Sequence, residues 1–167
     1  MKNLILIGMP GTGKSTVGVI LAKRLGYDFV DTDILISRTA GRTLPDILSN
    51  EGIDRFLELE GRVGTELRRE TSVIATGGSM IFSESAMENL KKDGLTVWLE
   101  TPVEVIEKRL EDTRVSRGVA APGHMTVRQI YAQREPVYRR YADIRIPCSE
   151  GTDNVVNAVL DAVAGKL

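Results

Sequence analysis

The chain has 167 residues, of which 42% are hydrophobic and 27% charged, and its formal net charge is −1. These values are typical of one globular domain, and we expect residues 1–167 to form that domain as a monomer. A charge near zero argues against a nucleic-acid or membrane surface as partner, and no apolar run reaches the roughly 20 residues that cross a bilayer. The single cysteine, Cys148, allows no internal disulfide, so we expect a cytoplasmic protein.

The first predicted strand, residues 4–7, leads into Gly8-Met9-Pro10-Gly11-Thr12-Gly13-Lys14-Ser15, and a helical pattern follows. The segment matches the phosphate loop G-x-x-x-x-G-K-S at every fixed position, in the strand–loop–helix context that the motif requires. Backbone N–H groups and the helix dipole of such a loop bind a polyanion, the lysine reaches the β- and γ-phosphates, and the serine binds Mg²⁺. We therefore predict Mg²⁺ and a nucleotide bound by Gly11, Thr12, Gly13, Lys14, Ser15 and Thr16.

A second strand, residues 27–31, ends in Asp31-Thr32-Asp33. Two residues that are one apart on an extended chain point in opposite directions. One of the two can therefore face the phosphate loop and its Mg²⁺ while the other faces a second substrate, where it could orient or deprotonate an attacking hydroxyl. Asp is also common in turns and helix caps, and this alternative stays open.

The rest of the chain alternates between helical and strand patterns. Strands are expected over residues 72–76, 95–99 and 144–146, and helices over 34–50, 53–69, 83–93, 101–111, 126–141 and 152–163. The first of these helices should break near Gly41 and restart at Thr43, with Asp46 as its capping-box partner. Five strands alternating with helices predict an α/β fold of three layers, a parallel sheet covered by helices on both faces.

Three further sites are ambiguous from the residues alone. Gly77-Gly78 is either a strand-ending turn or a place where the backbone approaches a ligand closely. Residues 112–124 have no clear period and predict a mobile loop, in which Arg117 is either solvated or closes over the transferred phosphoryl group. Arg134, on a helix, either pairs with a neighbouring glutamate or binds a substrate carboxylate.

The order of these features resembles the shikimate kinase family, which are small P-loop kinases related to the nucleoside monophosphate kinases. The matching parts cover nearly the whole chain: the phosphate loop, the Asp pair, Gly52, Phe56, Glu60, Gly77-Gly78, Arg117 and residues 134–138. The resemblance implies a sheet in the order 2-3-1-4-5, acceptor-binding helices over about 33–61 and a mobile lid over about 112–124. It further implies phosphoryl transfer from ATP to a hydroxyl of a small cyclic acid, giving shikimate 3-phosphate from shikimate.

The same resemblance implies roles for individual residues. Lys14, Asp33 and Arg117 would be catalytic, Ser15 and Asp31 would bind Mg²⁺, and Arg109 would pack near adenine. The acceptor would be held by Asp33 at its hydroxyls, by Gly77 and Gly78 at its ring, and by Arg134 at its carboxylate.

Three residues depart from the family pattern, all on the acceptor side. Leu57 stands where the family has a second arginine on the substrate carboxylate, Ser79 replaces a third glycine, and Gly118 replaces a proline. Loss of one charged contact should cost about 1.5–3 kcal/mol unless another cation, Arg55 or Arg62, replaces it. A kinase for another small polyol or hydroxy acid, or a nucleotide-binding regulatory protein without transfer, is therefore kept as an alternative.

Overall fold

The computed structural model describes residues 2–111, 119–148 and 151–167 and contains one five-stranded sheet. All four strand pairings are parallel and the order is β2-β3-β1-β4-β5, as the family resemblance implies. The strands are β1 Asn3–Ile7, β2 Asp28–Asp31, β3 Ser72–Ala75, β4 Gly94–Glu100 and β5 Ile144–Pro147.

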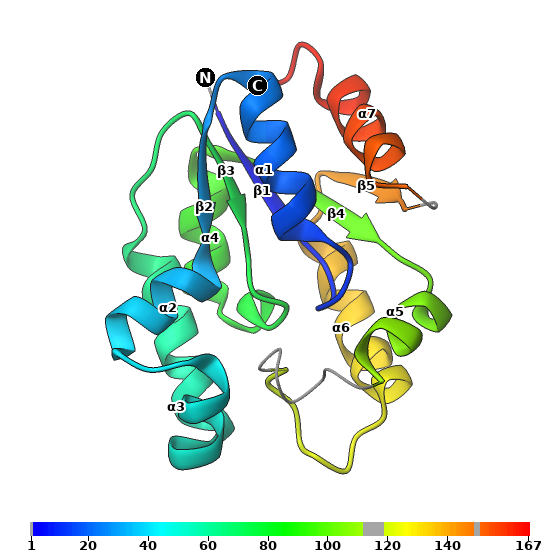
Figure 1. Cartoon of the computed structure of the whole chain (residues 1–167). Coiled ribbons are helices and arrows are strands. Elements are labelled where there is room, and N and C mark those ends of the chain that lie inside the picture. Colours follow the sequence, from blue (N-terminus) through cyan, green and yellow to red (C-terminus); the bar gives the residue numbers. More distant parts are fainter. Residues whose placement is uncertain (1, 112–118, 149–150) are drawn as a thin grey trace.

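Helices cover both faces of the sheet, which confirms the three-layer α/β prediction (Figure 1). The alternation along β1 explains the layers, because successive side chains of a strand point to opposite faces. Leu4 and Leu6 pack in one apolar cluster with α1 and α7, whereas Ile5 and Ile7 pack in another with α4, α5 and α6. The bounds are α1 Lys14–Leu25, α4 Glu84–Lys92, α5 Val103–Leu110, α6 Val127–Tyr141 and α7 Thr152–Val163.

Two helices, α2 (Thr32–Ala40) and α3 (Leu44–Glu66), extend beyond β2 at the lower left of Figure 1. The predicted break at Gly41 is confirmed, since this residue ends α2 with φ 65°. Thr43 caps α3 as predicted, but the capping box differs in one bond. The carboxylate of Asp46 accepts from the Thr43 hydroxyl at 2.6 Å, and not from the backbone N–H of Thr43. The expected gap before residue 53 is a kink at Gly52 (φ 83°) inside α3, which ends at Glu66 and not near residue 69. A short 3₁₀ helix, η1 (Met80–Phe82), was not predicted.

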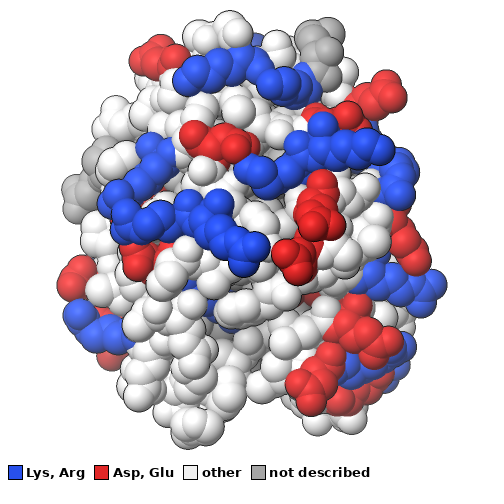
Figure 2. All heavy atoms as spheres, turned by 180° about the vertical axis from the view of Figure 1, so that it is seen from behind, with Lys and Arg blue, Asp and Glu red and all other residues white. Residues whose placement is uncertain are grey.

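Charged side chains of both signs lie on the face opposite that of Figure 1. Figure 2 shows Lys and Arg side chains there interspersed with Asp and Glu. Several of the charges over the whole surface are paired, as Lys91 is with Asp143. None of the helices in the described ranges is long and apolar enough to cross a membrane.

Candidate active site

The phosphate loop links β1 to α1 at the carboxyl edge of the sheet. Gly11 and Gly13 have φ angles of 83° and 88°, which residues other than glycine rarely adopt. These angles turn the loop toward the start of α1. The first-turn N–H groups of α1 lack carbonyl partners within the helix, so they can bind an anion. The hydroxyl of Thr12, buried in the loop, has no hydrogen-bond partner within the described structure. This loop therefore fits the phosphates of a nucleotide.

Lys14 lies folded beneath the loop. Its Nζ donates to the carbonyl oxygens of Gly8 at 2.7 Å and Met9 at 2.8 Å, which leaves one of its three N–H donors for a ligand. Burial lowers the pKa of Lys14 to about 8, against the attraction of the Asp33 carboxylate. Phosphate oxygens at the loop would add negative charge and favour the charged amine.

Asp31 connects the phosphate loop to α2. Its Oδ2 accepts from the Ser15 hydroxyl at 2.6 Å, and its Oδ1 accepts from the backbone N–H of Asp33 at 2.9 Å, so Asp31 is also the N-cap of α2. The side chains of Ser15 and Asp31, predicted to bind Mg²⁺, are thus in contact. Within the described ranges no group of three or more His, Cys, Asp or Glu side chains could hold a metal. A Mg²⁺ at this pair would complete its shell with phosphate oxygens and water.

Asp33 and Arg134 line a cavity of about 240 Å³ beside the phosphate loop. Burial, followed by the charge of Asp31, raises the pKa of Asp33 to about 6. Arg134 is only 2% exposed; its Nη2 donates to the carbonyl of Ala120 at 2.9 Å, and its guanidinium lies 5.7 Å from the ring centroid of Phe82. The cavity therefore has a carboxylate suited to a hydroxyl and a cation suited to a carboxylate.

Gly77 and Gly78 let these charged groups approach the backbone. A Cβ on Gly77 would lie 2.2 Å from Glu60 Oε1 and 2.7 Å from Asp33 Oδ1, and one on Gly78 would lie 2.9 Å from Arg134 Nη1. The pair is fixed by hydrogen bonds, because the Tyr138 hydroxyl donates to the Gly78 carbonyl at 2.6 Å. Any side chain at either glycine would displace the groups that line the cavity.

A second cavity, of about 540 Å³, lies on the other side of the phosphate loop, between α5 and α7. Arg109, predicted to contact adenine, lines it, and its Nη1 donates to the carbonyl of Gly11 at 2.8 Å. Gly11, Gly13 and Thr16 line both cavities. Ligands in the two spaces would therefore meet at the loop, which is the arrangement that transfer between them requires.

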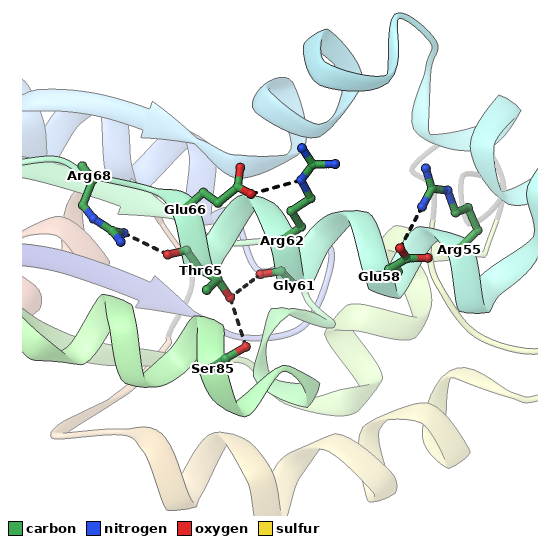
Figure 3. A network of polar contacts seen from close by, with 8 residues as sticks. All are labelled: Arg55, Glu58, Gly61, Arg62, Thr65, Glu66, Arg68 and Ser85. Carbon is green, nitrogen blue, oxygen red and sulfur yellow. Dashed lines mark hydrogen bonds and ion pairs between the residues drawn. The ribbon is translucent and has the colours of Figure 1, made fainter.

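The two candidate replacements for the missing arginine do not reach the cavity. Arg55 is exposed and pairs with Glu51 and Glu58, and Arg62 pairs with Glu66 on the outer face of α3 (Figure 3). Leu57 packs partly buried in an apolar cluster. Arg117, the predicted lid arginine, lies outside the described residues.

Sequence reasoning gave no chemical role to Glu60, which lines this cavity, or to Tyr138, which contacts one of its glycines. Glu60 is buried in its wall, where Ser79 donates a hydrogen bond to Glu60 Oε2. The available signal was the spacing of Glu60 four residues after Phe56, because this spacing puts the acid on the buried face of α3. Tyr138, which fixes Gly78, was marked only as part of the family match over residues 134–138.

Comparison with known proteins agrees with this geometry. A family model described as shikimate kinase matches residues 10–164. Shikimate kinases from Microcystis aeruginosa and Persephonella marina are 39% and 33% identical to the chain, over 96% and 98% of its length and 86% and 99% of theirs. The solved shikimate kinase from Acinetobacter baumannii, in complex with shikimate, superposes with a TM-score of 0.89 at 34% identity, covering 100% of this chain and 96% of that one.

Proposed function

The chain belongs to the shikimate kinase family and is an ATP-dependent kinase, and we propose that it phosphorylates shikimate to shikimate 3-phosphate. One observation carries this proposal: the phosphate loop joins two cavities, of which one holds Asp33 and Arg134 and the other Arg109. Shikimate offers a hydroxyl to the first of these residues and a carboxylate to the second. The relative from Acinetobacter baumannii was solved with this same acid bound.

In the proposed mechanism the protein mainly positions the two substrates and neutralises the charge of the phosphates. Lys14 and the loop N–H groups bind the phosphates, and Mg²⁺ bound at Ser15 and Asp31 would supply further positive charge there. Asp33 accepts a hydrogen bond from the attacking hydroxyl and takes its proton as the phosphoryl group transfers. Arg134 holds the carboxylate, so that the hydroxyl lies in line with the leaving group.

The glycine pair would hold the ring of the acceptor, and Arg109 would lie against adenine. Arg117 remains a predicted catalytic cation, and the monomeric state and cytoplasmic location remain predictions. Leu57 leaves the acceptor carboxylate with one arginine on the described part of the site, so the expected affinity for shikimate is modest. The same residue favours a second candidate, a kinase for another small hydroxy acid.

A coupled assay of ADP release with MgATP and shikimate tests the proposed function. Saturable turnover that depends on shikimate, with much less turnover for quinate and for an acceptor-free control, is the expected result. Equal rates with and without acceptor would rule out shikimate and leave either a kinase for another acceptor or a nucleotide-binding protein with slow hydrolysis. Better turnover of quinate would select the second candidate.

A further inference from the structure

Glu60 is a buried carboxyl group for which the described structure provides no ion pair. Its side chain lies in the wall of the acceptor cavity and the residue is 1% exposed. The hydroxyl of Ser79 donates to Oε2, whereas Oε1 is buried without a hydrogen-bond partner. A buried carboxylate in this situation is strongly disfavoured relative to the neutral acid.

Charged groups face Glu60 from three sides, yet none within the described ranges pairs with it. Asp33 lies beside Glu60 at Gly77: a Cβ added to this glycine would lie 2.2 Å from Glu60 Oε1 and 2.7 Å from Asp33 Oδ1. Lys14 and Arg134 act on Glu60 only at longer range, the first bound to loop carbonyls and the second to Ala120.

The helix of Glu60 itself supplies no cation. Its arginines at positions 55 and 62 point outward to Glu58 and Glu66 (Figure 3), and one turn before Glu60 the helix carries Leu57. Burial therefore dominates and raises the pKa of Glu60 to about 8, with Asp33 adding to the rise and with Ser79, Arg134 and Lys14 opposing it. Because Oε2 accepts from Ser79, the proton belongs on Oε1, the oxygen that lies beside Gly77.

We propose that Glu60 determines acceptor specificity through its charge state: as a neutral acid, it keeps the cavity open to an anionic acceptor that a single arginine must hold. This inference rests on the proposed function. Ionisation of Glu60 would place a second negative charge beside Asp33 and repel the acceptor carboxylate, lowering affinity about 10- to 100-fold. Ser79 tunes this state, since its hydroxyl donates to the carboxylate and favours the ionised form.

The kinetic test measures KM for shikimate between pH 6.5 and 9.5 at saturating MgATP, where bound phosphates keep Lys14 charged. We expect KM to be constant at low pH and to rise at least tenfold above an inflection near pH 8, with a smaller change in kcat. Glu60→Gln, which is always neutral, should remove the inflection. Ser79→Ala should move it to higher pH, which a purely structural role for Ser79 would not do. Glu66→Gln, an exposed acid on the same helix, is the matched control and should behave as the unaltered protein.

A second readout does not depend on activity. The infrared carbonyl band of a protonated carboxylic acid should be present at pH 7, should disappear as the pH rises through about 8, and should be missing in Glu60→Gln but retained in Glu66→Gln. Absence of that band, or an inflection in KM that persists in Glu60→Gln, would overturn the inference. A KM that falls with rising pH would also overturn it. If shikimate is not turned over while the band is present, the proposed function fails and the neutral state of Glu60 stands.

Discussion

Gly77→Ala tests whether the acceptor cavity is built as the geometry indicates. The added Cβ would lie 2.2 Å from Glu60 Oε1 and 2.7 Å from Asp33 Oδ1, so at least one carboxyl group must move by roughly 1 Å to restore a van der Waals separation. Asp33, the reacting group, must shift by roughly half that amount, and a misplacement of up to about 1 Å at such a group costs up to about 100-fold in turnover. Overpacking should also cost about 1–3 kcal/mol of stability, which lowers Tm by roughly 2–12 °C for a chain of this size.

The assay combines steady-state ADP release with calorimetric titration of nucleotide. We expect kcat/KM for shikimate to fall by up to about 100-fold while ATP affinity changes less than threefold, because the perturbation lies on the acceptor side of the loop. Gly94→Ala is the matched control. Gly94 begins β4, at the edge of the sheet opposite to the phosphate loop, and its added Cβ would lie 2.6 Å from the Leu90 carbonyl. It should lower Tm without changing KM. A Gly77→Ala protein with normal acceptor kinetics would refute the proposed arrangement of Asp33.

Three other substitutions give distinct expected outcomes. Lys14→Ala should reduce kcat at least 1,000-fold, because it removes a cation that binds the phosphates. Circular dichroism would check that the fold persists, and normal turnover would contradict the assignment of the phosphate loop. Asp33→Asn should reduce transfer at least 100-fold with nearly unchanged ATP affinity by calorimetry, and an equal loss of both would place Asp33 in the nucleotide site instead. Tyr138→Phe should lower the free energy of unfolding by about 1–3 kcal/mol in urea titration, because the partly buried Gly78 carbonyl loses its 2.6 Å hydrogen bond. This variant should raise KM for shikimate but not for ATP, and no change in either the free energy of unfolding or KM would contradict the role given to this bond.

Local sequence signals predicted most of the fold. The alternating strand and helix patterns gave every strand to within one or two residues, and the phosphate loop was identifiable because its glycines, lysine and serine are adjacent in the chain. The sheet order came only from the family resemblance, since pairing between distant strands leaves no local pattern. The late end assigned to α3 shows the limit of periodicity, because a helical pattern continues through residues that tertiary packing does not keep helical.

The acceptor site was less predictable for a different reason. Arg55 and Arg62 were reasonable replacements for a missing cation, but the choice between the cavity and a neighbouring glutamate depends on which face of α3 is buried. The family resemblance marked Glu60 as a matching residue but gave it no role, and only the structure shows that it is buried and in contact with Ser79. Whether a charged side chain takes part in binding depends on its neighbours in the folded protein, which are distant in sequence.

The two hydrogen bonds of Lys14 to the carbonyls of Gly8 and Met9 bear on the kinetics of nucleotide capture. They hold the loop in a defined shape before any phosphate arrives, so its conformational entropy is lost during folding and not on association. A ligand then exchanges existing hydrogen bonds for new ones without first ordering a flexible segment. The rate of ATP association should therefore be set by diffusion and orientation, and differences in affinity among nucleotides should arise mainly in their rates of dissociation.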